Sequence, residues 1–434
     1  MDWTIGIGQC RRDQYPSFAH NEVHLAGLPD SPFWQNHQNQ ILAQFPQSRR
    51  AGVLYVNKMN ENNPTDPYLI TEVSQIYSPG LLIFRDLVEH NLAAMIQMAG
   101  GADRLCPHCK THKTREIIRM EKELGIMSHK CATIAEAEML AGEEVPDILL
   151  AYQLVGPNLN RMAELIKRFP ESKFTSLIDN PTAAIQLSQT MSSHDIQIGV
   201  LIDLNPGMDR TGIDLGPDAL ELLEMVLTLD GLQLEGLHWY DGQNRQPDPQ
   251  QRRIAVETGW DQFIRFRDQV LLSGIPIRRI VTAGSGSFSI LAEKGEPNLQ
   301  LSPGTTVLFD SELAEIFPEL PFIPAVAILS RVVSNNRRHQ VTLDVGHKSC
   351  AADQPAGNRL RFPQFPHAKE IVQTEEHLVL LDPAVDDLEL GDTVIAIPRH
   401  ACPTTAVHKF AHVIADHHLV DRWEIVARDR QLTC

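Results

Sequence analysis

Three short runs, DILLAY at 147–152, KFTSLI at 173–178 and IGVLIDL at 198–204, carry the pattern from which the fold can be read. Each run is β-rich, and a segment with helical features follows it. After the second run, Asn180 can cap a helix and Pro181 takes the first helical position. Short β-rich runs that alternate with amphipathic helices indicate successive βα units.

The same alternation extends outward on both sides. Five further strands are predicted at Arg104–Cys109, Met127–Cys131, Leu234–Tyr240, Arg279–Ala283 and Thr305–Phe309. Between them lie helical windows such as the one opened by Thr133 and Glu136, which have the spacing of a capping box. Eight βα units in roughly 230 residues predict a (β/α)8 barrel of the TIM type. A doubly wound open sheet is the alternative, because counting strands does not show closure.

The two ends of the chain differ from this middle part. Beyond about Pro321 the helical windows stop and short strands are predicted at Ala325–Val333, His339–Asp344, His377–Leu381, Thr393–Ile397 and Trp423–Arg428. Residues 1–77 are polar, and only Val53–Val56 and Tyr68–Ile76 look strand-like or buried. We therefore expect an α/β protein with three parts: a partly disordered extension (1–77) associated in part with the β domain, a barrel (78–320) and an all-β domain (321–434).

Charge and composition remove several function classes. The 434 residues include 38 Lys and Arg against 55 Asp and Glu, a net charge of −17, and no basic block that could follow a phosphate backbone. No apolar stretch approaches the roughly 18 residues of a membrane span. We expect no nucleic-acid or membrane partner and a cytoplasmic location. Seven scattered cysteines fit reduced thiols better than a disulfide framework.

The densest group of reactive residues is CPHCKTHKT at 106–114. Cys106 and Cys109 have the spacing of a redox pair or of half a zinc site, but no second pair completes such a site, and burial of both cysteines is the default interpretation. Lys110 ends the first predicted barrel strand, on the face where barrel enzymes build active sites. A lysine desolvated there can act as a Schiff-base nucleophile.

Two loops and one short motif add binding capacity. Gly284-Ser285-Gly286 follows predicted strand seven and Gly304-Thr305 lies at predicted strand eight, where barrels bind phosphate with backbone N–H groups and hydroxyls. His400 and Cys402 lie two residues apart in a segment predicted to be extended, so both side chains would face one side and suit zinc or another divalent ion. His408 and His412, four apart, form a rival pair.

Four motifs in order resemble one known group. They are Ser78–Leu82, Pro107–Lys113, Asp203–Gly212 and Pro398–Thr404. They are similar to the D-threonine aldolase and D-serine dehydratase group of the alanine-racemase-like, fold type III pyridoxal phosphate enzymes. The resemblance runs from about residue 78 to the C-terminus, and residues 1–77 lie outside it.

The resemblance implies roles for particular residues. Lys110 would hold pyridoxal 5'-phosphate as a Schiff base, Arg210 would lie by the cofactor's phenolate oxygen and Tyr240 by its ring. Gly284, Ser285, Gly286, Gly304 and Thr305 would surround its phosphate. Ser302 stands where alanine racemases carry an arginine that faces the pyridine nitrogen. His400 and Cys402 would bind a catalytic zinc, manganese or magnesium ion.

The activity that the resemblance implies is retro-aldol cleavage of a small D-β-hydroxy amino acid to glycine and an aldehyde, by a homodimer. Dehydration to a 2-oxo acid and ammonia is the first alternative, followed by a racemase and by a non-catalytic cofactor-binding protein. Aldolases of the group carry Tyr-His-Gly after strand six, whereas this chain has Tyr240-Asp241-Gly242. Asp241, with its pKa raised by burial, is therefore the expected base, and His238 is its rival.

Overall fold

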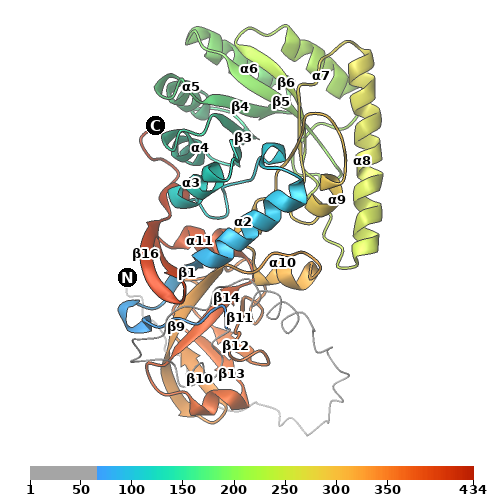
Figure 1. Cartoon of the computed structure of the whole chain (residues 1–434). Coiled ribbons are helices and arrows are strands. Elements are labelled where there is room, and N and C mark those ends of the chain that lie inside the picture. The colour runs from blue at the N-terminus through green and yellow to red at the C-terminus, as the bar shows by residue number, and fades with distance from the viewer. Residues whose placement is uncertain (1–65) are drawn as a thin grey trace, which may run out of the picture. The chain divides into compact units, whose positions relative to one another are not determined.

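The computed structural model describes residues 66–434 (Figure 1). Its first sheet is parallel and has seven strands, each paired with the next along the chain. These are β2 (Ser128–Cys131), β3 (Asp147–Gln153), β4 (Lys173–Ile178), β5 (Ile198–Leu204), β6 (Leu232–Trp239), β7 (Arg279–Thr282) and β8 (Leu299–Leu301). The TIM-like barrel is confirmed.

The barrel is closed by a segment that is not a regular strand. The prediction of a strand at Arg104–Cys109 is wrong in this respect: the segment makes isolated parallel bridges, Leu105 with Leu301 of β8 and His108 with Lys130 of β2. The Cys106 N–H donates to Leu301 (2.8 Å), and the Cys109 N–H donates to Lys130 (2.9 Å). Pro107 lies between them and lacks an N–H, so a continuous ladder cannot form. The segment nevertheless joins both edges of the sheet, which excludes the open-sheet alternative.

The eighth strand lies earlier than predicted. β8 ends at Leu301, and the predicted strand at Thr305–Phe309 instead begins with a 3-10 turn, Thr305–Val307. Pro303 supplies no N–H and so favours leaving the ladder there, which gives a physical reason for the short strand. The β-branched residues Thr305, Thr306 and Val307 produced the wrong prediction, because their propensity is that of a strand.

Helices connect and cover the parallel strands (Figure 1). They are α2 (Arg85–Ala99), α3 (Arg115–Glu123), α4 (Ile134–Gly142), α5 (Asn158–Arg168), α6 (Pro181–Ser193), α7 (Pro217–Leu227), α8 (Pro249–Leu272), α9 (Phe288–Ala292) and α10 (Ser311–Ile316). Two predicted caps are confirmed: the Thr133 hydroxyl accepts from the Glu136 N–H (3.1 Å), and the Asn180 side chain accepts from the Thr182 N–H (2.9 Å). Within residues 66–434 no helix combines the length and the apolar character needed to cross a membrane.

The second sheet is mostly antiparallel and belongs to the C-terminal part. Its strands are β9 (Val326–Arg337), β10 (Gln340–Leu343), β11 (Leu360–Arg361), β12 (Lys369–Gln373), β13 (Leu378–Leu381), β14 (Thr393–Pro398), β15 (Phe410–Ala415) and β16 (His418–Glu424), together with β1 (Gly80–Phe84). β1 pairs antiparallel with β9 and parallel with β15, so residues expected at the start of the barrel complete this sheet instead. The boundaries near residues 78 and 321 stay predictions.

Near the ends of the chain, the structure departs from the sequence predictions in two places and agrees with them in a third. The strand predicted at Trp423–Arg428 is wrong beyond Glu424, because a 3-10 turn occupies Val426–Arg428. A short helix, α11 (Ala401–Val407), interrupts the part predicted to be all β. Tyr68 and Ile76 are buried as expected, without a strand, whereas Val53–Val56 lies outside the described residues.

One apolar cluster packs inside the barrel, to which Cys106, Leu149, Leu177, Leu201 and Val281 contribute. A barrel filled in this way is a packed core and leaves only its rim for chemistry. The polar side chains that follow the strands are therefore the candidates for a functional site.

Candidate active site

Lys110 lies where the sequence predicted, just after the closing segment of the barrel. Its backbone N–H donates to His108 Nδ1 (3.2 Å), which fixes the turn, and its side chain is half-buried. The stem lies along Gly304: a Cβ atom added there would stand 3.8 Å from Lys110 Cε and 3.1 Å from His108 Cβ. A larger residue at position 304 would therefore crowd His108, the residue that fixes the turn before the lysine.

The two loops expected to bind phosphate offer free donors. Within residues 66–434, the backbone N–H groups of Ser285, Gly286 and Gly304 make no hydrogen bond. The Gly284 N–H is different, because it donates to the Ser287 hydroxyl (3.1 Å) and to Asp241 Oδ1 (3.3 Å). Ser285, Gly286 and Gly304 can thus bind an anion through their N–H groups. Gly284 instead holds the loop in place through its own hydrogen bonds.

Tyr240 follows β6 and lies beside two cations. The Arg210 guanidinium carbon is 5.0 Å from the centre of its ring, and Lys130 Nζ is 5.3 Å from it. Gly284 packs on the same ring, since a Cβ there would stand 3.2 Å from Tyr240 Cε2. Arg210 and Tyr240, predicted from different strands, are brought together.

Ser302 carries a hydroxyl without a partner. Its side chain is buried, its backbone N–H donates to Thr282 (2.8 Å), and its Oγ makes no hydrogen bond within residues 66–434. A buried hydroxyl left alone costs free energy, so such an atom points to a bound group that would satisfy it. The residues around Lys110 therefore fit pyridoxal 5'-phosphate: an amine, a cradle of N–H donors and an orphaned hydroxyl.

Asp241 is held firmly in its loop. Its Oδ1 accepts from the Ser287 hydroxyl (2.7 Å), and its Oδ2 accepts from the Asn244 amide (2.9 Å). Burial raises its pKa above the ordinary value, although these hydrogen bonds oppose the shift. Because both oxygens already anchor neighbouring loops, the contacts favour a structural role over the predicted role as base.

His400 and Cys402 come together, but for a different reason from the predicted one. They do not lie on a strand: β14 ends at Pro398, His400 caps α11, and Cys402 belongs to its first turn. His400 Nδ1 lies 2.5 Å from Asp353 Oδ2, a partner that the sequence did not reveal. The prediction that strand alternation aligns the two side chains is therefore wrong, although, against the effect of burial, Cys402 is close enough to help raise the pKa of His400.

The Cys402 thiol faces the Lys110 segment. Its sulfur is 3.2 Å from Thr111 Oγ1 and 3.8 Å from Thr305 Oγ1, so Thr305 approaches this sulfur as well as the phosphate loop. Burial raises the pKa of this thiol, but the hydrogen bond from His400 and the charge of Lys110 outweigh burial and lower it. The environment thus supports a thiolate, the form that binds metals.

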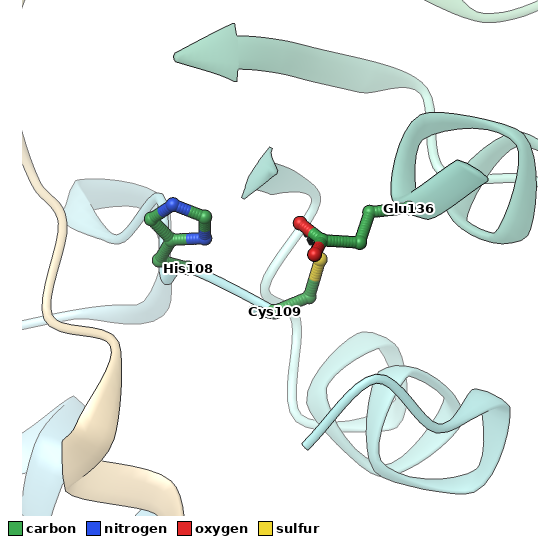
Figure 2. A group of neighbouring side chains, drawn as sticks. All are labelled: His108, Cys109 and Glu136. Atoms are coloured by element: carbon green, nitrogen blue, oxygen red, sulfur yellow. Dashed lines mark hydrogen bonds between the residues drawn. The ribbon is translucent and has the colours of Figure 1, made fainter. Parts of the chain in front are cut away.

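A second group of potential metal ligands lies nearby but is already neutralised. Figure 2 shows the Glu136 carboxylate beside the Cys109 thiol, with the His108 ring across from them. Lys113 forms an ion pair with Glu136, which also accepts from the Ala132 N–H (2.6 Å). Burial and then Glu136 raise the pKa of Cys109 well above its usual range. A protonated thiol and an engaged carboxylate are poor metal ligands, so the arrangement favours a structural network.

The geometry supports neither a cysteine redox pair nor a histidine metal pair. Cys106 lies in the barrel core, whereas Cys109 contacts Glu136, and burial raises the pKa of both thiols, the opposite of what a reactive redox pair needs. His408 follows α11 and His412 lies on β15, so they do not have the helical spacing of a metal pair. His408 Nε2 instead bonds to the Ser349 carbonyl (2.8 Å).

His238 was expected only as a rival base, and its contacts with Lys130 and Asp203 were not predicted. Lys130, His238 and Asp203 form a buried chain, with Lys130 Nζ 2.8 Å from His238 Nε2 and His238 Nδ1 2.6 Å from Asp203 Oδ1. Each lies near the end of a predicted strand, which was the available signal. Nothing in the sequence shows that side chains from β2, β5 and β6 meet.

Two family models match the chain. The model described as "Alanine racemase, N-terminal domain" matches residues 83–311, and the model described as "Putative serine dehydratase domain" matches residues 325–414. The first covers the barrel and more than half of the chain, and the second covers most of the antiparallel sheet.

Named relatives and a solved structure agree with these models. A D-threonine aldolase of Arthrobacter sp is 28% identical over 369 residues, 84% of this chain and 95% of that protein. A D-threo-3-hydroxyaspartate dehydratase of Delftia sp. (strain HT23) is 22% identical over 80% of this chain and 96% of its own. The crystal structure of D-threonine aldolase from Filomicrobium marinum is 26% identical, with a TM-score of 0.77 over 83% of this chain and 98% of the other.

Proposed function

This chain belongs to the family defined by the alanine racemase N-terminal domain, and within that family we propose that it is a pyridoxal-phosphate-dependent lyase. Its reaction is the cleavage of a small D-β-hydroxy amino acid to glycine and an aldehyde, as the names of the aldolase relatives suggest. The observation that carries the proposal is the convergence of Lys110, Thr111 and Cys402 at the rim of the barrel.

The cofactor would be held by residues from five parts of the barrel. Lys110 would bind it covalently, and the N–H groups of Ser285, Gly286 and Gly304 would bind its phosphate. Tyr240 and Arg210 would lie by the ring of the cofactor. The Ser302 hydroxyl would form a hydrogen bond with a polar atom of that ring. Pyridoxal phosphate supplies an electron sink for the carbanion left when a bond to the α-carbon breaks.

A divalent metal would be held by His400 and Cys402. Asp353 accepts from the His400 ring and would keep its other nitrogen directed at the metal, as outer carboxylates do for histidine ligands. A nitrogen and a sulfur donor suit zinc, with manganese and magnesium as the other candidates. Such an ion supplies Lewis-acid polarisation, and two protein ligands leave positions open for a hydroxyl or carboxylate.

The chain's own residues would orient the reaction. Thr111 and Thr305 fix the Cys402 sulfur beside the lysine segment, so that the amine and the proposed metal site face one substrate. Asp241 sets the loop that carries Tyr240 through its bonds to Ser287 and Asn244. His238 is engaged at both ring nitrogens, so its contacts too are those of a positioning residue.

Dehydration is the second candidate, because the Delftia relative is named as a dehydratase and covers a similar share of the chain. The two reactions differ in their products. The purified protein, loaded with pyridoxal phosphate and a divalent metal, should be incubated separately with D-threonine and D-threo-3-hydroxyaspartate. Glycine with an aldehyde supports the aldolase, and a 2-oxo acid with ammonia supports the dehydratase. The absence of both product pairs, with L-threonine as control, would overturn the proposal.

A homodimer and a cytoplasmic location complete the proposal. Size-exclusion chromatography with light scattering tests the first, and cell fractionation tests the second. A monomer that turns over substrate at full rate would contradict the proposed dimer.

A further inference from the structure

Lys130 is a buried lysine inside the barrel, next to the segment that carries Lys110. It lies on β2, and its backbone pairs with His108, two residues before Lys110. Only 3% of its surface is exposed. Its side chain spans from β2 to β6, where Nζ meets His238, and it passes under the ring of Tyr240 at 5.3 Å from the ring centre. It therefore lies against residues that would contact the cofactor.

His238 and Asp203 fix the position of the Lys130 amine. Asp203 Oδ1, 2.6 Å from His238 Nδ1, accepts the proton of that nitrogen, which leaves Nε2 free to accept from Lys130 Nζ at 2.8 Å. This orientation is the one in which a neutral histidine links a carboxylate to an ammonium. Burial, followed by the charge of Lys130, lowers the pKa of His238, in agreement with a neutral ring.

The amine keeps unused donors. An ammonium has three N–H groups, and the hydrogen bond to His238 is the single one that Lys130 Nζ makes within residues 66–434. Buried ammonium groups normally have several acceptors, because losing water costs far more than one hydrogen bond returns. Two donors at the rim of the barrel therefore lack the oxygen atoms that would satisfy them.

The charges around the amine indicate what kind of oxygen is missing. Lys110 and Arg210 repel the ammonium, while Asp203 and Cys106 are the groups that favour it. His108, His238 and Tyr240 also face this region. Burial, with the repulsion from Lys110 and Arg210, lowers the pKa of Lys130 to about 8. A site with three cations and one engaged carboxylate is built to receive negative charge.

We propose that Lys130 is a ligand-binding residue of the active site, whose free N–H groups bind an anionic oxygen of the cofactor or of the substrate. The inference rests on the proposed function, since it assumes that pyridoxal phosphate binds at Lys110. Two oxygens have the required chemistry: the phenolate of the cofactor and a carboxylate of the substrate. A charge-assisted hydrogen bond to either is worth about tenfold or more in binding.

The test compares Lys130→Met, which keeps the stem and removes the donors, with Lys173→Met. Lys173 is the matched control, since it starts β4 at the opposite end of the barrel and its side chain is half-exposed. Fluorescence titration gives the dissociation constants of pyridoxal 5'-phosphate and of its 3-deoxy analogue, which lacks the phenolate. Steady-state kinetics with D-threonine give kcat and KM, and thermal unfolding checks folding.

Two results would support the proposal, and they distinguish the phenolate of the cofactor from the carboxylate of the substrate as the ligand. If the phenolate is the ligand, Lys130→Met raises the dissociation constant of pyridoxal phosphate by about tenfold or more and leaves that of the 3-deoxy analogue unchanged. If the carboxylate is the ligand, both affinities stay at the wild-type value and KM rises by about tenfold with a smaller change in kcat. The control variant Lys173→Met should change neither the two dissociation constants nor KM.

Other results overturn it. Wild-type affinities together with wild-type KM in Lys130→Met show that the amine is structural. If this variant fails to fold, the wild-type protein is tested instead. It is labelled with acetic anhydride, and mass spectrometry measures how far Lys130 and Lys173 are acetylated. Protection of Lys130, but not Lys173, by pyridoxal phosphate or by added D-threonine supports the proposal, and equal labelling rejects it. A wild-type protein that binds no pyridoxal phosphate overturns the proposed function itself, a result distinct from all of these.

Discussion

The hydroxyl oxygen of Thr111 lies 3.2 Å from the thiol sulfur of Cys402, although 291 residues separate them in the chain. Thr111 is the neighbour of Lys110, and Cys402 is in the first turn of α11. The Thr405 hydroxyl donates to the Thr111 carbonyl (2.5 Å) and forms a second link between the same segments. The Lys110 segment and the His400–Cys402 motif, which the sequence suggested separately, thus lie against each other, as the proposed single site requires.

Replacing Lys110 by alanine should abolish covalent cofactor binding. The Lys110 side chain lies along Gly304, near the free N–H donors, so we expect the bond to form at its amine. After borohydride reduction, mass spectrometry should find the adduct on the Lys110 peptide of the wild type and nowhere in Lys110→Ala. Lys167→Ala, an exposed lysine on α5, is the control and should keep the adduct. An adduct on Lys130 in the variant would contradict the assignment.

Removal of the metal should stop turnover without unfolding the protein. Two protein ligands contribute little to folding in comparison with a closed four-ligand site. A chelator should therefore lower kcat by a factor of about a hundred or more and leave circular dichroism and the visible absorption of the cofactor in place. Cys402→Ala should reproduce this effect, while Cys434→Ser, a thiol far from the motif in sequence, should not. Unfolding on chelation would indicate a structural metal instead.

Asp241→Ala should reduce stability more than it reduces the intrinsic chemistry. The change removes the carboxylate that accepts from Ser287 and Asn244 and takes away one of the two acceptors of the Gly284 N–H, at a cost of about 2–4 kcal/mol in the free energy of unfolding. Urea denaturation measures this cost. Ser287→Ala removes the bond to Asp241 and the bond from the Gly284 N–H but keeps the carboxylate, so it should lose less, about 1–2 kcal/mol.

The competing hypothesis for Asp241 predicts a different pattern. If it were the base, Asp241→Asn, which keeps one of the two acceptor oxygens, would still bind the cofactor but would lose roughly a hundred- to ten-thousandfold in kcat. That combination would reinstate the role expected from the sequence.

His112 should make stability fall in mild acid. Burial lowers its pKa to about 4, against the opposing charge of Glu121. Because the unfolded chain has the higher pKa, near 6.5, it binds the proton more tightly, so stability is complete above that pH and is lost as pH falls towards 4. The contribution is about 3 kcal/mol.

A variant isolates this contribution from the carboxylates that titrate in the same range. In His112→Asn the amide oxygen can still accept from the Thr114 N–H, which bonds to His112 Nδ1 at 3.2 Å in the wild type. Between pH 6.5 and 4, urea denaturation should show that this variant loses less stability than the wild type. The exposed His367→Asn should follow the wild type. Parallel curves for all three proteins would show that His112 does not titrate on unfolding.

The sequence by itself determined the features that depend on neighbouring residues. The runs at 147–152, 173–178 and 198–204 form strands, Asn180 caps α6, and Lys110 ends a barrel segment, because periodicity, caps and turn residues act over a few positions. The same local logic erred at Thr305–Val307 and at His400–Cys402. There a proline, or the start of a helix, overrode the β-branched or alternating pattern.

Only the tertiary structure decided which distant side chains meet. The sequence places Lys130 and His238 on strands 108 residues apart, but the contact between them depends on the curvature that brings β2 opposite β6. The same is true of β1, whose pairing with β9 and β15 takes it out of the barrel. Strand propensity is local, whereas register and closure are set by the burial of whole faces, so a residue's partner across the barrel is fixed only when the sheet closes.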